Sequence, residues 1–285
     1  MKYYFKYYYL SKISLFLLGK LRAFHKLEDQ VIVYSGDHIG EEIYCNGFYE
    51  KKEILSIMNS FDFDTSKFNC LDIGANIGNH AIKFSKYFKS VHCFEPNPNV
   101  YDILNFNAKN RSNITTYNFG LSNKNEEQYL SYNSQNHGGG KVVESLNDSS
   151  TGFSIKLKTL DDFFTENVAY IKIDIEGHES YAIEGMINLL NNDKPILSFE
   201  YHNNLGGDVI FEKLREIGYD KFFIPFESNF IKRRFPNRFR LIGFLFGGFF
   251  IPRYKLVELQ KVKENFYSLI IAENSQSKYR IKTNY

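Results

Sequence analysis

Three carboxylates surround a single glycine turn in the second half of the chain. Asp174 ends the mostly apolar run 170–173, and Glu176 and Glu179 lie on either side of Gly177. Carboxylates this close together repel one another, so they need a proton, a metal ion or a cationic ligand to neutralise them. Glu179 also fits a structural role, because an acid in the first turn of a helix interacts favourably with the helix dipole. Asp174 ends a strand that we expect to be buried, so a structural role explains it less well.

Another acid and a histidine follow at the end of the next apolar run. Glu200 comes directly after residues 196–199, and His202 lies two residues further on. Histidine changes its charge near neutral pH, which suits a general base. His202 is therefore slightly preferred over Asp174 as the group that removes a proton from an acceptor.

The turn that would place a ligand near these acids starts at residue 70. The apolar run 70–73 leads into Gly74 and Gly78, and a helical pattern follows. Such a strand, glycine turn and helix N-terminus form a site for a nucleotide-like ligand, because free N–H groups point at it and glycine lets it approach the backbone. Glu95 ends the next apolar run, where an acid would meet ribose hydroxyls. The alternative is a turn that only packs a helix on a strand.

The glycine spacing separates two classes of cofactor. A dinucleotide fingerprint needs glycine at positions 74, 76 and 79, but Asn76 and Asn79 occupy two of them. The pattern Asp-x-Gly-x-x-x-Gly instead fits S-adenosylmethionine, which has no pyrophosphate and whose sulfonium would neutralise nearby acids. We therefore predict S-adenosylmethionine as the cofactor, and a nicotinamide-dependent oxidoreductase is the less favoured alternative.

Strands and helices alternate over most of the chain, which predicts an α/β fold with right-handed crossovers and a mostly parallel sheet. The predicted strands are 70–73, 91–94, 114–119, 170–173, 196–202, 222–224 and an antiparallel 267–272, and the predicted helices are 79–88, one beginning at Pro98, 179–190 and 208–217. In such a sheet the ligand binds beyond the carboxyl ends of the strands. The candidate cofactor-binding residues lie at or near these ends: Asp72, Gly74, Asn76, Gly78, Glu95, Asn118 and Asp174. Asn118 would read the adenine or its surroundings, and a turn-forming asparagine is the equally favoured alternative.

The motif-bearing stretches together resemble the FkbM family of S-adenosylmethionine-dependent methyltransferases. The resemblance covers about residues 65–205 and rests on segments 72–80, 94–98, 118–122, 160–163 and 172–179. The most distinctive segment is Lys172-Ile173-Asp174-Ile175-Glu176-Gly177-His178-Glu179. The resemblance implies the class I methyltransferase fold, which is Rossmann-like, with a seven-stranded sheet and helices on both faces.

The resemblance also implies roles for individual residues. Gly74, Gly78 and Glu95 would hold the cofactor, and Asp174 would lie beside its methionine part or its methyl group. The acceptor side would be lined by Glu176, Glu179, Glu200 and His202, and the family pattern does not settle which residue is the base. A Mg²⁺ ion held by Asp174, Glu176 and Glu200 is an alternative that the spacing alone does not favour.

Family members commonly belong to gene clusters for bacterial surface polysaccharides and natural products. We therefore expect an O-methyltransferase that acts on a sugar hydroxyl of such a polysaccharide or a related glycan. The alternatives are an N- or C-methyltransferase of a small natural product and a non-catalytic, membrane-associated binding protein. The retained acids argue against the last, because an inactive site does not need mutually repelling carboxylates.

Beside the core, we expect a lead-in over residues 1–64, a methyltransferase domain over 65–275 and a tail over 276–285. The domain contains a polar insertion at 121–158, which we expect to be β-rich and to face the substrate, and a basic-aromatic insert at 228–255. In the lead-in we expect strands at 31–34 and 43–45 and a helix at 50–58. In the polar insertion, we expect 129–132 to pair with 155–157.

Charge and cysteine content bear on partners and location. A net charge of +2 gives no indication of nucleic-acid binding. Three widely spaced cysteines, Cys45, Cys70 and Cys93, are typical of a reducing cytosol. The apolar block 13–18 is too short to span a bilayer, and the basic-aromatic and apolar segment 231–251 suits contact with a membrane surface, although an ordinary aromatic hairpin is favoured. We thus expect a cytoplasmic protein, with peripheral contact at the inner membrane face as an option, and the oligomeric state stays open.

Overall fold

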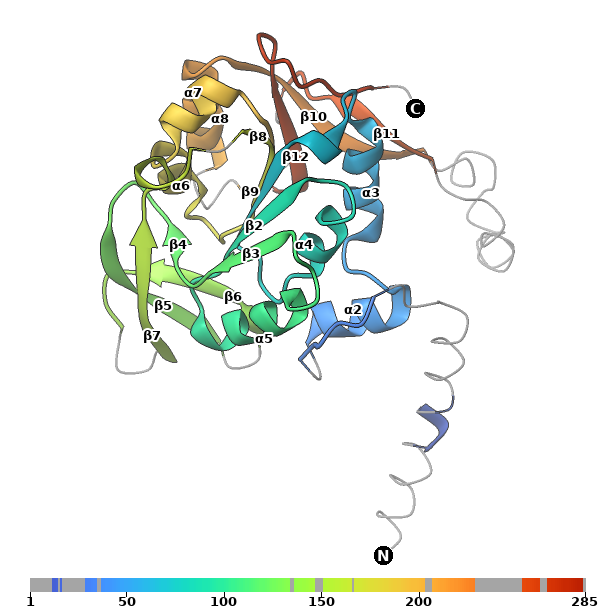
Figure 1. Ribbon diagram of the computed structural model, residues 1–285, viewed down its shortest axis with the longest axis vertical. Helices are drawn as coiled ribbons and strands as arrows, with labels where there is room; N and C mark the ends of the chain where they lie inside the picture. The colour runs from blue at the N-terminus through green and yellow to red at the C-terminus, as the bar shows by residue number, and fades with distance from the viewer. Residues whose placement is uncertain are drawn as a thin grey trace, which may run out of the picture.

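The computed structural model describes residues 12–14, 16, 29–34, 37–133, 136–146, 151–165, 167–202, 207–228, 253–261 and 266–283. Its centre is an eight-stranded sheet with helices on both faces, and a smaller four-stranded sheet lies beside one end of it (Figure 1). The predicted α/β fold with a mostly parallel sheet and helices on both faces is confirmed.

The central sheet has the strand order β11-β10-β12-β9-β8-β1-β2-β3. Its strands are β1 (Asn69–Ile73), β2 (Ser90–Phe94), β3 (Ile114–Tyr117), β8 (Val168–Ile173), β9 (Ile196–His202), β10 (Tyr219–Ser228), β11 (Arg253–Glu258) and β12 (Phe266–Asn274). Strands β3, β2, β1, β8 and β9 pair in parallel, and β12 pairs antiparallel with both β9 and β10, as predicted for residues 267–272. The sheet has one strand more than the expected seven, because β11, the first half of which lies in the predicted insert, pairs antiparallel with β10.

Alternation along the strands divides the apolar core between the two faces of the sheet. In β1, Leu71 and Ile73 face one core, and Cys70 faces the other. The Leu71 core is covered by α6 (Glu179–Glu184), α7 (Ile187–Asp193) and α8 (Gly207–Glu216). The Cys70 core is covered by α3 (Lys51–Ser60), α4 (Asn79–Phe84) and α5 (Pro98–Ala108). Cys70 and Cys93 are buried, free thiols.

The N-cap prediction for α5 is confirmed, because the Asn97 side chain accepts hydrogen bonds from the backbone N–H groups of Asn99 and Val100. The predicted helix 179–190 is instead two short helices. They are separated near Gly185, where a side chain would collide with the backbone of Ser122.

Both strands predicted in the lead-in are wrong. Residues 31–34 form no strand, and 43–45 lie within α2 (His38–Asn46). Ile39 and Ile43 are one helical turn apart and pack against Ile77 and Val100, so tertiary burial overrides the strand preference of β-branched residues. The predicted helix at 50–58 is confirmed as α3.

The polar insertion folds as the four-stranded sheet β4-β7-β5-β6. Its strands are β4 (Gly120–Leu121), β5 (Glu126–Asn133), β6 (Asn136–Val143) and β7 (Thr151–Lys158). The two strands that contain the predicted segments, β5 and β7, do pair antiparallel, but the register differs, because residues 129–132 lie opposite 151–154 and residues 155–157 lie opposite 126–128. Leu130, Ile155 and Leu157 form a small core of their own, which makes this polar segment a folded unit.

The C-terminal segment packs back onto α3. Tyr279 is buried in the Cys70 core, the N–H of Asp62 donates to the Arg280 carbonyl, and the N–H of Lys282 donates to the Ser60 carbonyl. In the described ranges, no helix is long and apolar enough to cross a membrane. The basic-aromatic segment 231–251 lies outside these ranges.

Candidate active site

A cavity of about 570 Å³ opens at the carboxyl ends of β1, β2, β8 and β9. This volume is within the usual range of about 300–1,000 Å³ for small-molecule sites. Six of the predicted site residues line the cavity: Gly74, Asn76, Glu95, Asp174, Glu176 and Glu200. The other five are not among its lining residues: Asp72, Gly78, Asn118, Glu179 and His202.

Three residues that line the cavity have a left-handed backbone that side chains other than glycine rarely adopt. They are Glu50, Asn76 and Glu176, with φ angles of 50°, 51° and 55°. Such conformations cost about 1–3 kcal/mol each and cluster at functional sites. In the part of the chain that the structure describes, Lys194 is the one other non-glycine residue with a positive φ.

The two glycines of the predicted turn have different roles. Gly74 has a φ of 76°, and a side chain there would collide with the carbonyl of Asp174, so glycine lets the ends of β1 and β8 approach closely. Gly78 precedes α4 with a φ of 85°, which turns the chain into the helix. The motif is therefore as much a requirement of the backbone as of a ligand.

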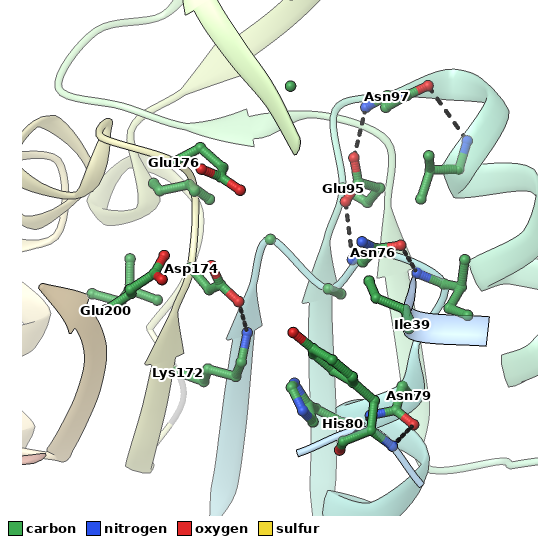
Figure 2. Close-up of a pocket in the computed structure, with 18 of the residues that line it drawn as sticks. Ile39, Asn76, Asn79, His80, Glu95, Asn97, Lys172, Asp174, Glu176 and Glu200 are labelled. Carbon is green, nitrogen blue, oxygen red and sulfur yellow. Dashed lines mark hydrogen bonds and ion pairs between the residues drawn. The ribbon is translucent and has the colours of Figure 1, made fainter. Parts of the chain in front are cut away.

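Figure 2 shows Asn76, Glu95 and Asn97 on one side of the cavity, which we call the Glu95 wall. Glu95 Oε2 accepts from the N–H of Asn76 at 3.0 Å, and Oε1 accepts from the N–H of Asn97 at 2.9 Å. Burial nevertheless raises the pKa of Glu95 to about 7. Each oxygen keeps a lone pair, so the carboxylate can still accept from a hydroxyl group. Asn118 donates to the Glu95 carbonyl at 3.0 Å, so it holds this loop.

The opposite side, which we call the Lys172 wall, consists of Lys172, Asp174, Glu176 and Glu200 (Figure 2). Lys172 Nζ lies 3.0 Å from Asp174 Oδ2 and 3.8 Å from Oδ1 of Asp72, which is directly opposite Lys172 in the pairing of β1 with β8. The chain thus contains its own cation for the repelling carboxylates, which the sequence interpretation missed. The sequence does indicate the pairing of Lys172 with Asp174. Asp174 follows directly after the strand, and residues two apart along an extended chain share a face.

The ionisation of the Lys172 wall follows from burial and mutual repulsion. Burial would lower the pKa of Lys172, but Asp174, Asp72 and Glu50 raise it above its usual value. Burial raises the pKa of Asp72 to about 6, although Lys172 opposes this. Burial and then Asp174 and Glu176 raise the pKa of Glu200 to about 7, and burial followed by Asp174 raises that of Glu176. A carboxylate that titrates near neutral pH is suited to take up a proton.

Two predicted acceptor-side residues lie behind this wall. The buried Glu179 accepts from the N–H groups of Ile175 and Gly177, each at 3.2 Å, so it supports the turn that carries Glu176. His202 lies beside Glu179 and Glu200 in a hollow of about 10 Å³. Its Nδ1 is buried and has no hydrogen-bond partner among the atoms that the structure describes.

The lead-in contributes residues that the sequence interpretation missed. Tyr49 and Glu50, which connect α2 to α3, line the cavity. Asn79 holds this turn, because its side chain accepts from the N–H of Tyr49 at 3.3 Å and donates to its carbonyl at 3.2 Å. His80 Nε2 lies 3.4 Å from Glu50 Oε2. Burial raises the pKa of Glu50 to about 7.

The four-stranded sheet adds an apolar surface to the same cavity. Leu130, Val142 and Leu157 line it, from β5, β6 and β7. His178 also lines it, and its Nε2 lies 3.0 Å from Ser122 Oγ. Burial lowers the pKa of His178. Across the described ranges, no group of three His, Cys, Asp or Glu residues is placed to hold a metal ion.

The chain is similar to known methyltransferases. The chain is 30% identical over 128 residues to the hexuronic acid methyltransferase AglP of Haloferax volcanii. The matched region covers 42% of this chain and 51% of that protein. The chain therefore spans about half the length of this curated relative.

Among solved structures, the methyltransferase FkbM from Methylobacillus flagellatus KT is similar, with 20% identity and a TM-score of 0.38, over 52% of this chain and 38% of that one. A putative methyltransferase from Streptococcus mutans in complex with SAH is similar at 9% identity and a TM-score of 0.42, over 78% and 96% of the two chains. The methyltransferase FkbM domain matches residues 72–221, which is just over half of the 285 residues. The chain belongs to the FkbM methyltransferase family.

Proposed function

We propose that this methyltransferase uses S-adenosylmethionine to methylate a hydroxyl oxygen of a sugar, in a bacterial surface polysaccharide or a related glycan. The observation that carries this proposal is the pair of acidic walls on opposite sides of one cavity. S-adenosylmethionine carries an electrophilic methyl group on a sulfonium cation. The family implies this cofactor, and the residues present fit it.

The Glu95 wall fits the nucleoside end of the cofactor. Glu95 is held by two backbone N–H groups and keeps lone pairs for the ribose hydroxyls. Asn76 and Gly74 bring backbone close to the same space. The Lys172 wall fits the other end, because its carboxylates outnumber its one lysine and favour a nearby positive charge.

On the acceptor side, we assign the general base to Glu200. Its carboxylate lines the cavity, is half-buried, and has a pKa raised to about 7, which is matched to proton transfer at neutral pH. Asp174, held by Lys172 at 3.0 Å, would keep the reacting groups in line. His202, which lies outside the cavity beside Glu200, is the weaker candidate for the base.

A sugar acceptor is supported by two features. The similar protein from Haloferax volcanii is named for methylation of a hexuronic acid. Carboxylates on one side of the cavity and apolar side chains from the smaller sheet on another suit a molecule that has hydroxyl groups along its edge and C–H groups on its faces.

The test is methyl transfer from S-adenosylmethionine with a ¹³C-labelled methyl group to a panel of neutral, amino and acidic glycosides. We expect NMR to locate the labelled methyl group on a sugar oxygen. We expect this transfer to be lost in the Glu200→Gln variant. The matched control is Glu212→Gln, an exposed acid on α8, which should leave transfer unchanged. A label found only on nitrogen or carbon, or no transfer to any glycoside, would contradict the proposal.

A further inference from the structure

The charge on the cavity lining is strongly unbalanced. Of the described residues that line it, eight are aspartate or glutamate, and Lys172 is the one lysine or arginine. Four of these acids gather around the acceptor side: Glu50, Asp174, Glu176 and Glu200, which act on one another electrostatically. The cofactor supplies one sulfonium, so excess negative charge remains for the acceptor to meet.

The single lining lysine is not available to an acceptor. Lys172 Nζ lies between Asp174 and Asp72, and only 6% of its side chain is exposed. Lys141 on β6 is close enough to lower the pKa of Glu176. However, its neighbours Gly140 and Val142 line the cavity, so Lys141 points to the opposite face of its strand, and it is exposed to solvent.

We propose that this cavity selects an uncharged or amino-bearing sugar as its acceptor and rejects a sugar that carries a carboxylate. The inference deepens the proposed function and rests on it. An acidic sugar would bring its carboxylate out of water against like charges, and among the described residues that line the cavity no lysine or arginine is free to pair with it, which is unfavourable for binding and for transfer. A neutral sugar instead donates its hydroxyl protons to the same carboxylates.

The apolar side of the cavity points to the same class of acceptor. Leu130, Val142 and Leu157 offer surface for the C–H face of a sugar ring and no charged group to pair with a carboxylate. Glu50 and Glu200 lose their protons around pH 7. Discrimination against an acidic sugar should therefore grow between about pH 6 and about pH 8, a range in which a uronic acid is already ionised.

The experiment compares methyl glucoside, methyl glucosaminide and methyl glucuronide, which share the ring but differ in charge. Transfer from S-adenosylmethionine gives kcat/KM for each, and saturation-transfer NMR on the protein loaded with S-adenosylhomocysteine gives binding without turnover. We expect the glucoside to be preferred over the glucuronide by at least about tenfold in both readouts. Glu176→Gln should narrow this ratio, and Glu212→Gln, the exposed control on α8, should leave it unchanged.

Failure of this inference is separable from failure of the proposed function. Methylation of the glucuronide as efficient as that of the glucoside would overturn the inference and retain sugar methylation. If neither sugar is methylated, the proposed reaction fails, and NMR then decides the inference. Binding of the glucoside but not the glucuronide would support it, whereas equal binding of both, or binding of neither, would overturn it.

Discussion

The two acidic walls of the cavity use the same chemical group in different ways. On the Glu95 wall, one buried carboxylate has a backbone N–H group on each oxygen. On the Lys172 wall, several carboxylates share one buried lysine, which itself lies between Asp72 and Asp174. Burial raises carboxyl pKa values on both walls, to about 7 for Glu95 and Glu200.

The difference shows how the surroundings of an acid determine its use. Fixed N–H donors orient Glu95 and leave it ready to receive hydroxyl groups, which suits binding. On the Lys172 wall the carboxylates repel one another and share one lysine. The gain or loss of a proton by one carboxylate therefore changes the pKa of the others, which suits proton transfer. Stability should therefore depend most on Lys172, catalysis on Glu200 and cofactor affinity on Glu95.

The largest effect is expected for Lys172→Met. The substitution leaves Asp72 buried and Asp174 without its ion pair, and breaking a buried pair costs about 3–5 kcal/mol. We expect the free energy of unfolding in urea to fall by this amount. Adding Asp72→Asn to this variant should restore part of the lost stability, because the second substitution removes the buried unpaired charge. If Lys172→Met alone is as stable as the wild type, Lys172 does not neutralise this wall.

Next in size is the effect of Glu200→Gln on turnover. Loss of a general base typically lowers the rate by about 10²–10⁴-fold. We expect kcat to fall in this range while the dissociation constant for S-adenosylhomocysteine stays nearly unchanged. If His202→Gln lowers kcat this much and Glu200→Gln does not, the base is His202.

Glu95→Gln should have a smaller effect, confined to binding. The amide keeps the shape but has one oxygen acceptor in place of two, so it loses charge-assisted hydrogen bonds worth about 1.5–3 kcal/mol. We expect calorimetry to show about 10- to 100-fold weaker binding of S-adenosylhomocysteine. Turnover at saturating cofactor should be close to that of the wild type, and a large loss of kcat with unchanged affinity would remove the distinction between the walls.

The smallest effect concerns stability as a function of pH. The pKa of Glu200 is about 7 in the folded protein, against 4.5 ordinarily, so the folded state holds its proton more tightly. This contribution to stability is complete below about pH 4.5 and is lost as the pH rises through about 7. Urea unfolding across this window should show a shallower decline for Glu200→Gln than for the wild type. Identical slopes would contradict the raised pKa.

Much of the fold and the site was predictable, because an apolar strand that ends in a polar residue indicates both a strand of the sheet and a position at its ligand-binding edge. Alternating strands and helices indicated the parallel sheet, and Glu95, Asp174 and Glu200 were found from their positions at strand ends. All three line the cavity. The roles of these residues stay proposals.

The rest depended on contacts that local patterns do not contain. Tyr49 and Glu50 reach the cavity because Asn79 and His80, distant in the sequence, hold their turn. The spacing of Lys172 and Asp174 indicates that they share a face, whereas the contact of Lys172 with Asp72 depends on the register that places the two opposite each other. Residues 43–45 suit a strand locally, whereas the packing of Ile43 against Ile77 and Val100 favours the helix α2.

The central claim, that the two walls hold S-adenosylmethionine, is tested most directly by titrating the purified protein with S-adenosylhomocysteine and with NAD in a calorimeter, with and without Mg²⁺. We predict that S-adenosylhomocysteine binds with a dissociation constant on the order of micromolar, that NAD does not bind, and that Mg²⁺ changes neither result. Binding of NAD without binding of S-adenosylhomocysteine would contradict the account.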